Sequence, residues 1–329
     1  MEIIVFGSGA WGTALALLLH ARGHRVTLWN RDPARAAAMA ETRENPRLAG
    51  AVLPPGLAVT AEAAAGAEAE LAVFAVPSYA MRAAAEAVGP FLKPGCLCVS
   101  VSKGLEAGSL LRMTQVLGGV LGEGYPTAAL SGPSHAEEVA LGMPTGVVAA
   151  AEERETALRV QDAFMGPAFR VYTNPDVAGV ELCGALKNVV AIGSGVADGL
   201  GFGDNARALL ITRAMNEAAA LCLKAGGQSA TCSGLAGTGD LIVTCSSRHS
   251  RNRRAGLLLG QGLGVEETLR QVGAVVEGYY AAAAMRSLSE KLGVEMPICH
   301  GIYEVLYEGL RPEAAIRRLM ERDRREEFS

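Results

Sequence analysis

The sequence predicts an α/β fold, in which an N-terminal doubly wound sheet domain is followed by an all-helical C-terminal domain. The chain has 329 residues, half of them apolar and 40 of them glycine, which is enough to bury two cores. In the first half, short apolar runs alternate with alanine-rich helical stretches, as in a sheet covered by helices on both faces. After residue 180, longer segments with helical periodicity replace the apolar runs.

The N-terminal segment forms one strand–loop–helix–strand unit of the size expected for a parallel βαβ crossover. An apolar run at 2–6 precedes a glycine-rich loop, helical spacing follows at 14–22, and a second strand is predicted at 25–29. Later strands of the same sheet are predicted at 71–76, 96–101, 128–130, 147–151 and 169–172.

Apolar-periodic segments separated by glycine-rich turns fill the second half of the chain. The dipeptide Asn174-Pro175 breaks the last predicted strand, so we place the boundary there and divide the chain into domains 1–178 and 179–329. Helices of the second domain are predicted at 181–197, 204–225, 253–260, 265–271, 278–291 and 312–322.

Composition and charge exclude several classes of protein. The net charge of −4 lacks the basic excess of a nucleic-acid-binding protein. No apolar run approaches the roughly 20 residues that span a bilayer, and the N-terminus has no charged leader, so we expect a cytoplasmic protein without an integral membrane segment. The seven cysteines are odd in number and include no C-x-x-C pair, which predicts buried free thiols in a reducing compartment and no metal site.

The loop Gly7–Gly12 has the spacing G-x-G-x-x-G between a predicted strand and a predicted helix. In that context Gly7 permits the tight turn, Gly9 lets the backbone approach a pyrophosphate, and Gly12 allows the helix to pack closely on the strand. The helix that follows would present its free N–H groups to the pyrophosphate. The loop therefore predicts a Rossmann-like dinucleotide-binding domain.

The end of the second strand bears on the choice of cofactor. NAD-binding sites usually carry an acidic residue there that holds the ribose hydroxyls. Here Asp32 precedes Pro33 and is predicted to cap the next helix, which leaves Arg31 to face a 2′-phosphate. The sequence therefore predicts NADPH or NADH as the cofactor.

Polar loops follow three later strands, at the edge where open α/β sheets bind ligands. They are 76–78, 102–106 and 131–136. Lys103 lies in the second loop and is either a ligand-binding residue or an ordinary surface lysine. We assign no catalytic role to His135, because a structural histidine fits this position equally well.

Lys187 lies beside Asn188 on an otherwise apolar helical segment. A buried amine must pair with a carboxylate or lose its proton, and a poised amine is a useful acid/base. The alternative is a lysine that extends to the surface or forms a structural ion pair. Asp240 is the candidate partner, with Thr244 about one helical turn further on, although Asp240 is also suited to cap a helix.

The basic segment 248–254 contains Ser250, Arg251 and Asn252 at the predicted start of a helix. Ser250 can cap that helix, and a helix N-terminus that carries an arginine suits a phosphate group. By composition alone the segment is a solvated basic face or a weak nucleic-acid patch. The negative charge of the whole chain favours a small phosphate-bearing ligand.

Six motifs, taken together, resemble the motif series of bacterial NAD(P)-dependent glycerol-3-phosphate dehydrogenases in order and spacing. They are Gly7–Ala14, Val101–Gly104, Leu130–Ser134, Leu186–Asn188, Gly237–Leu241 and Ser250–Asn252. The resemblance implies NAD(P)H-dependent, reversible reduction of dihydroxyacetone phosphate to sn-glycerol 3-phosphate, which supplies glycerophospholipid synthesis. It implies Lys187 as the catalytic acid/base with Lys103 and Asp240 beside it, and we expect a homodimer.

The resemblance also assigns binding residues. Those expected around the cofactor are Gly7, Gly9, Ala10, Trp11, Gly12, Arg31, Lys103, Ala136, Arg251, Val275 and Glu277. Those expected to hold the substrate are Lys103, Gly132, Ser134, Lys187, Asn188, Asp240, Thr244, Ser250, Arg251 and Asn252. Two positions depart from the family pattern: Ala10 replaces a polar residue, and 279–281 lack the usual threonine–basic pattern.

Two alternative functions remain open. A β-hydroxyacid-type dehydrogenase shares the two-domain plan, but it usually places its lysine and asparagine four positions apart, whereas Lys187 and Asn188 are adjacent. A non-catalytic nucleotide-binding sensor would not need Lys187 and Asp240, both of which stand in their motifs.

Overall fold

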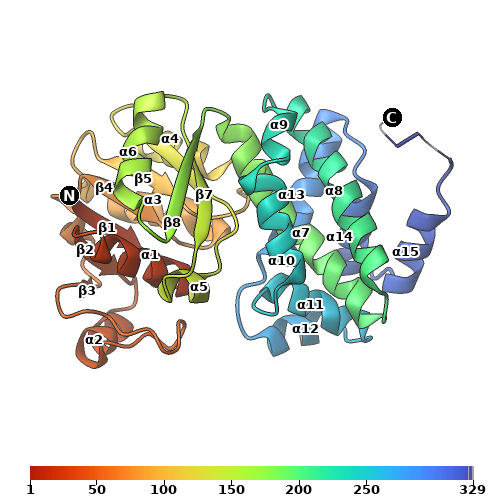
Figure 1. Ribbon diagram of the computed structural model, residues 1–329, viewed down its shortest axis with the longest axis horizontal. Coiled ribbons are helices and arrows are strands. Elements are labelled where there is room, and N and C mark those ends of the chain that lie inside the picture. Colours follow the sequence, from red (N-terminus) through yellow and green to blue (C-terminus); the bar gives the residue numbers. More distant parts are fainter. Residues whose placement is uncertain (325, 328–329) are drawn as a thin grey trace.

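An eight-stranded sheet forms the first domain, with the strand order β3-β2-β1-β4-β5-β6-β7-β8 (Figure 1). The computed structural model describes residues 1–324, 326 and 327. All neighbouring strands are parallel except β6 and β7, which are antiparallel. The order reverses between β1 and β4, and sheets of this kind bind ligands at the carboxyl ends of the strands beside such a reversal. The strands are β1 Glu2–Phe6, β2 Arg25–Trp29, β3 Ala58–Thr60, β4 Leu71–Phe74, β5 Leu97–Ser100, β6 Thr127–Ser131, β7 Thr145–Ala150 and β8 Phe169–Asn174.

Helices cover both faces of the sheet, so its strands are apolar on both sides. Ile3 and Val5 of β1 lie in the same core as Leu15 of α1, whereas Ile4 and Phe6 lie in the core that contains α3 and α4. Because successive side chains of a strand point to opposite faces, this division follows directly from the run at 2–6. The helices of this domain are α1 Ala10–Ala21, α2 Pro33–Thr42, α3 Met81–Val88, α4 Met113–Leu121, α5 Ala136–Ala140 and α6 Arg154–Phe164, with 3₁₀ turns η1 Ala63–Gly66, η2 Ser78–Ala80 and η3 Gly89–Phe91.

The second domain is helical and is built around α7 (Figure 1). The helix α7 contacts α8, α10, α11 and α13, and a Cβ atom added at Gly195 or Gly256 would overlap the backbone of the facing helix. These glycines therefore let α7 and α11 approach closely. The elements are α7 Val177–Gly199, α8 Asp204–Lys224, α9 Ser229–Cys232, a π-helical turn η4 Leu235–Gly239, α10 Asp240–Ser246, α11 Arg251–Gly260, α12 Val265–Val272, α13 Glu277–Leu292, α14 Pro297–Tyr307 and α15 Pro312–Met320.

The predicted fold class is confirmed: a parallel-dominated sheet domain precedes a helical domain. The boundary predicted after residue 178 falls in the first turn of α7, which Asp176 caps by accepting a hydrogen bond from Gly179 N. Several elements were not predicted, including β3 and the helices α9, α10 and α14. The strand β3 has only three residues at the edge of the sheet, and α14 starts at Pro297.

The helix α7 is long and apolar enough to cross a membrane by length and composition alone. In the structure, however, 89% of its apolar window is buried inside the protein, as in the core helix of a folded domain. The helix therefore belongs to the core of the second domain.

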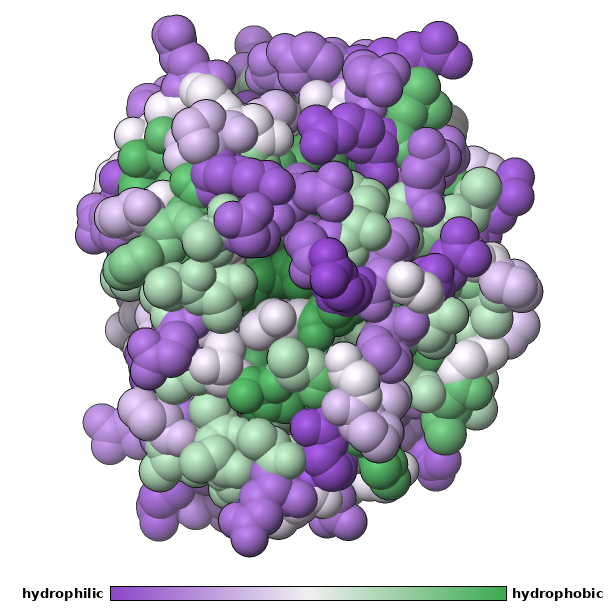
Figure 2. Space-filling model, turned by 90° about the vertical axis from the view of Figure 1, so that its left-hand side faces the viewer, coloured by the Kyte–Doolittle hydropathy of each residue, from purple (hydrophilic) through white to green (hydrophobic). Residues whose placement is uncertain are grey.

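Figure 2 shows the face of the sheet domain, where hydrophilic and hydrophobic residues are intermixed.

All seven cysteines are buried and free, as predicted. They divide between the two domains: Cys96 and Cys98 lie in the sheet domain, and five lie in the helical domain.

A buried ion pair joins the two domains at the start of α4. Arg112 Nη1 donates to Glu181 Oε2 of α7 at 2.7 Å, and Thr114 donates to the same carboxylate through its backbone N at 2.9 Å and its Oγ1 at 2.5 Å. The Glu181 side chain is 4% exposed. Burial raises the pKa of Glu181, and the arginine and threonine oppose that shift.

Replacing Arg112 with methionine leaves the buried carboxylate without its countercharge. We expect the free energy of unfolding to fall by about 3 kcal/mol, the usual cost of breaking a buried pair from one side. Urea denaturation followed by tryptophan fluorescence measures it. The matched control is Arg286→Met, because Arg286 pairs with the half-exposed Glu290 and should contribute less than about 1 kcal/mol. Equal losses in the two variants would contradict the prediction.

Candidate active site

Loops from the sheet meet helices of the second domain beyond the carboxyl ends of β4, β5 and β6. Ser78 follows β4, and its Oγ donates to Glu277 at the start of α13 at 2.7 Å. Lys103 follows β5, and its Nζ donates to Asp240 of α10 at 2.5 Å and to the carbonyl of Gly132, after β6, at 2.9 Å. The predicted edge of the sheet is thus the place where both domains supply polar groups.

The glycine-rich loop turns from β1 into α1 as its spacing predicts. Gly7 has φ +110°, and a Cβ atom there would lie 2.6 Å from the carbonyl oxygen of Ala75. A Cβ atom at Gly12 would overlap the carbonyl oxygen of Gly7, whereas one at Gly9 would meet nothing within 4 Å. Gly7 and Gly12 are therefore required by the fold, and Gly9 leaves open space beside the backbone.

The start of α1 fits the pyrophosphate of a dinucleotide. Its N-cap is Gly9, which supplies no side-chain hydrogen bond to the first turn, so the turn that begins with Ala10 can donate its N–H groups to an anion. Trp11 Nε1 is buried and has no hydrogen-bond partner within the described residues. An unpaired buried donor next to an uncapped helix start is what an absent polar ligand would leave.

The end of β2 has the arrangement predicted for it. Asp32 caps α2, accepting hydrogen bonds from Ala34 N at 3.0 Å and Arg35 N at 3.3 Å, with Pro33 at the first helical position. Arg31 is exposed, and within the described residues it makes no hydrogen bond or ion pair with another site residue. The acidic side chain is therefore engaged in capping, while the cation remains exposed at the end of the strand.

Two lysines from different domains share one carboxylate. Lys187 Nζ of α7 donates to Asp240 Oδ1 at 2.5 Å and to Thr244 Oγ1 at 3.0 Å, while Lys103 Nζ donates to Asp240 Oδ2. Asp240 is 1% exposed and Lys187 is 8% exposed. The predicted pairing of Lys187 with Asp240 and Thr244 is present in the structure, and Lys103 is not an ordinary surface lysine.

This arrangement shifts the pKa values of its members. The pKa of Lys103 is lowered to about 8, because burial and the nearby charge of Lys187 together outweigh the opposing effect of Asp240. Burial raises the pKa of Asp240, but the two lysine charges outweigh it, so that the pKa lies below its usual value. The carboxylate is therefore ionised, and Lys103 can lose its proton near neutral pH.

A single π-helical turn places Asp240 opposite Lys187. In η4, Gly239 N donates to Gly234 O at 3.1 Å, and Gly237 lies so close to the backbone of Cys232 that a Cβ atom would overlap its carbonyl. Thr238 Oγ1 donates to the Cys232 carbonyl at 3.0 Å. Such turns are rare and occur often at functional sites.

Four residues from four segments form a chain of amide hydrogen bonds beside the lysines. Asn188 Nδ2 donates to the carbonyl of Lys103 at 3.0 Å, and Asn252 Nδ2 donates to Asn188 Oδ1 at 2.9 Å. Asn252 Oδ1 in turn accepts from Gly278 N at 2.9 Å. The chain links the loop after β5 to the starts of α11 and α13.

The loop after β6 contributes Gly132 and Ser134. Gly132 has φ +142°, and its carbonyl accepts from both Lys103 and Ser134 Oγ, the latter at 2.8 Å. Ala136 is the first residue of α5 and is buried in the core that includes α1. Burial lowers the pKa of His135, and the charge of Lys187 adds to that effect. This loop therefore lies close to both the glycine-rich loop and the lysines.

Ser250 caps α11 by accepting from Arg253 N at 3.2 Å, as predicted. Arg251 is exposed at the first position of that helix, and its charge lowers the pKa of Glu277, although burial raises that pKa more. Val275 is half-buried just before α13. The starts of α11 and α13 therefore lie side by side at the domain junction.

Several contacts of the site were missed by the sequence analysis. Ser78 lies in a loop that was singled out, but its bond to Glu277 spans 199 residues. The unusual Tyr280 packs its ring against Tyr79 of η2 at 5.2 Å, so this departure from the family pattern makes a further contact between the domains. The only sequence feature that pointed to Ser78 was a run of polar residues after an apolar strand. Such a run does not indicate which distant residue the side chain will contact.

The sequence matches two family models over most of its length. Residues 2–157 match the N-terminal model of NAD-dependent glycerol-3-phosphate dehydrogenase, and residues 176–317 match the C-terminal model. The chain is 52% identical to the glycerol-3-phosphate dehydrogenase, NAD(P)+, of Moorella thermoacetica over 99% of this chain and 97% of that protein. It is 48% identical to the enzyme of the same name from Desulfitobacterium hafniense, over 99% and 93% of the two chains.

A solved structure agrees with these sequence matches. The crystal structure of glycerol-3-phosphate dehydrogenase from Coxiella burnetii superposes with a TM-score of 0.94 at 38% identity, over 98% of this chain and 99% of that one. The family resemblance carried by the six motifs is thereby confirmed. The chain belongs to the NAD-dependent glycerol-3-phosphate dehydrogenase family.

Proposed function

We propose that the protein reversibly reduces dihydroxyacetone phosphate to sn-glycerol 3-phosphate with NADPH or NADH, and so supplies glycerophospholipid synthesis. The observation that supports this most is the buried group of Lys187, Asp240 and Lys103, in a chain whose glycine-rich loop leads into an uncapped helix start. Membership of the family fixes the class of chemistry to which this group belongs.

Lys187 is the proposed acid/base. Bound NADPH or NADH would supply the hydride that reaches the carbonyl carbon of the substrate. Negative charge then grows on the carbonyl oxygen, and the Lys187 ammonium donates a proton to it. Asp240 orients that ammonium through a 2.5 Å hydrogen bond, and Lys103 adds a second positive charge next to it. In the reverse direction Lys187 accepts the proton from the hydroxyl group.

The start of α11 is the proposed phosphate site. Ser250 keeps the helix capped, Arg251 presents an exposed guanidinium at the first turn, and the helix dipole favours an anion there. Asn252 connects this helix start to Asn188 and therefore to Lys187, its neighbour on α7. The phosphate and the carbonyl of one small substrate would thus contact neighbouring elements. Gly132, Ser134 and Thr244 complete the proposed substrate contacts.

We propose that the cofactor contacts residues of the glycine-rich loop, the end of β2 and the domain junction. They are Gly7, Gly9, Ala10, Trp11, Gly12, Arg31, Lys103, Ala136, Arg251, Val275 and Glu277. We also propose that the protein is a cytoplasmic homodimer. Sedimentation equilibrium should give twice the mass of the 34.0 kDa chain.

The direct test is oxidation of NADPH and NADH by the purified protein with dihydroxyacetone phosphate, followed by absorbance. We expect turnover with this substrate and none with a β-hydroxyacid and NAD(P)+. Turnover of the β-hydroxyacid alone would instead favour the alternative dehydrogenase class. Cofactor binding without turnover of either substrate would favour a nucleotide sensor.

Arg31 should discriminate between the two cofactors. Because its guanidinium is exposed where a 2′-phosphate is expected, Arg31→Ala should raise KM for NADPH about tenfold and leave KM for NADH nearly unchanged. Steady-state kinetics with both cofactors measure the effect. Arg35→Ala, on the exposed side of α2, is the matched control. Equal changes in the two KM values would contradict the prediction.

The ionisation of Lys103 should determine the alkaline limb of the pH profile of kcat/KM. Its pKa of about 8 means that it is charged below that pH and neutral above it. If the charge helps to bind the substrate, kcat/KM for dihydroxyacetone phosphate falls as the pH rises through about 8, with a slope approaching tenfold per pH unit. Lys103→Arg retains the charge, so its limb should move to higher pH even if the rate is lower. Identical limbs in the two proteins would contradict the assignment.

A further inference from the structure

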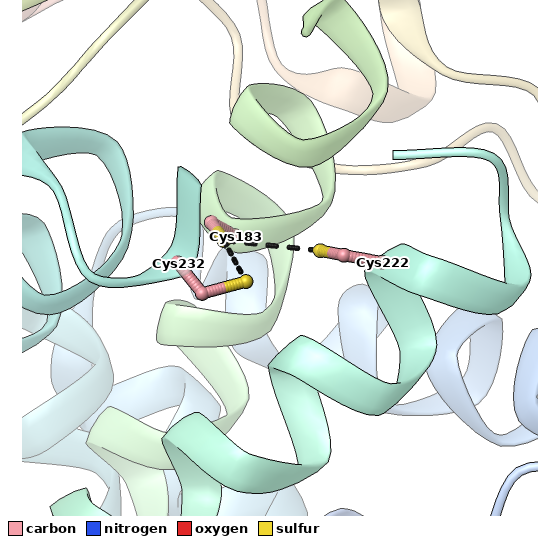
Figure 3. Close-up of side chains that lie close together, drawn as sticks. All are labelled: Cys183, Cys222 and Cys232. Atoms are coloured by element: carbon pink, nitrogen blue, oxygen red, sulfur yellow. Dashed lines mark hydrogen bonds between the residues drawn. The ribbon is translucent and has the colours of Figure 1, made fainter. Parts of the chain in front are cut away.

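Three buried cysteines from three helices lie together in the second domain, next to the proposed active site but outside it. Figure 3 shows the side chains of Cys183 (α7), Cys222 (α8) and Cys232 (α9) pointing toward one another. Their Sγ atoms are 3.4 Å apart between Cys183 and Cys232 and 4.0 Å apart between Cys183 and Cys222, and all three lie within 4.8 Å of one another. Each residue is at most 2% exposed.

We propose that Cys183, Cys222 and Cys232 form a three-sulfur binding site for a thiophilic metal ion, monovalent copper. The distances between the three Sγ atoms support this proposal. For a metal–sulfur bond of about 2.3 Å, three sulfurs around one ion stand about 4 Å apart, so each observed distance needs to change by less than about 1 Å. Each thiol that binds as a thiolate releases its proton to solvent.

The donor set selects the ion. Soft thiolate ligands favour monovalent copper and zinc, but zinc in a closed protein site takes four ligands. A fourth ligand from Asp176 would compete with hydrogen bonds that its oxygens already accept, from Gly179 N at 2.8 Å, Gln228 N at 2.8 Å and Thr231 Oγ1 at 2.6 Å. Monovalent copper is satisfied by three sulfurs, one of which can remain a neutral thiol and so limit the buried charge.

An ion can reach the site through α9. This helix is a single turn at the surface: Cys232 faces inward, while Ser229 and Ala230 are exposed. Opening such a short element costs little compared with unfolding the domain. The site therefore needs no permanent channel.

Binding at the cluster would act on the proposed catalytic group. Cys183 lies one helical turn before Lys187 on α7, and the carbonyl of Cys232 anchors the π-helical turn that carries Asp240. An ion that changes the spacing of Cys183 and Cys232 therefore displaces α7 relative to Asp240. We expect one equivalent of copper to lower dihydroxyacetone phosphate reduction, a consequence that rests on the proposed function, whereas the binding itself does not.

The test is an anaerobic titration of the full-length protein with monovalent copper, held by the coloured chelator bicinchoninate. We expect one copper ion per chain, a sulfur-only coordination shell by X-ray absorption, and at least tenfold weaker binding in Cys222→Ala and Cys183→Ala. Cys299→Ala removes a buried thiol of the same domain outside the cluster and should bind like the parent protein.

Three results would overturn the proposal. The first is stoichiometric binding that survives in the Cys183→Ala, Cys222→Ala double variant, and the second is loss of binding in Cys299→Ala. The third is tighter binding of zinc than of monovalent copper in the same competition. Circular dichroism of each variant separates loss of the site from loss of the fold.

Discussion

Lys187→Met should lower kcat for reduction of dihydroxyacetone phosphate about a thousandfold, because it removes the proposed proton donor to the carbonyl oxygen. Methionine nearly preserves the volume of the lysine stem, so the packing of α7 should survive. The Asp240 carboxylate keeps Lys103 as its partner and is not left without a countercharge. Steady-state and single-turnover kinetics at saturating NADPH measure the loss.

The control for this variant must separate chemistry from folding. Lys224→Met replaces an exposed lysine at the end of α8 and should leave kcat unchanged. The dissociation constant for NADPH, measured by tryptophan quenching, should change little in Lys187→Met. A kcat within tenfold of the parent value, with cofactor binding intact, would remove Lys187 from the chemistry.

Asp240→Asn should also reduce activity at neutral pH by about a thousandfold, through both lysines at once. The carboxylate accepts from Lys187 and Lys103 and raises the pKa of Lys103 against burial. An amide cannot balance two buried ammonium groups, so the pKa of Lys103 falls below its present value of about 8. Kinetics over a range of pH should therefore show part of the activity returning as the pH is lowered.

The direction of that pH shift is the informative part of the experiment. A lysine whose pKa has been lowered is protonated only at lower pH, so the alkaline limb of kcat/KM must move toward acid. Asp204→Asn, which changes an aspartate that is 94% exposed at the start of α8, is the matched control and should leave the profile in place. An unshifted limb in Asp240→Asn would mean that Lys103 does not set it.

Much of the fold follows from local sequence. The alternation of apolar runs and helical segments predicts the sheet domain, and the turn chemistry predicts the caps at Asp32 and Ser250. Lys187 could be paired with Asp240 because each is a charged residue within an apolar segment, where it must find a partner. Each of these features can be predicted because its physical cause lies within a short stretch of the sequence.

The contacts between the domains could not be predicted in the same way. Lys103 and Asp240 lie 137 residues apart, and Arg112 and Glu181 lie 69 apart. A charged residue in an apolar segment reveals that a partner exists, but only the packing of the two domains against each other determines which one. The cluster of Cys183, Cys222 and Cys232 could not be predicted from the sequence for the same reason. These cysteines lack the spacing of a metal-binding motif along the chain.

The ties between sheet loops and helices also constrain how the two domains can move. Ser78 holds α13, Lys103 holds α10 and Arg112 holds α7, so three separate segments of the first domain are each attached to a different helix of the second. Two attachments leave a hinge axis along the line that joins them, and a third attachment on another helix opposes rotation about that axis. The protein should therefore behave as one rigid body around its site, with the lysines held at their working distance before any substrate arrives.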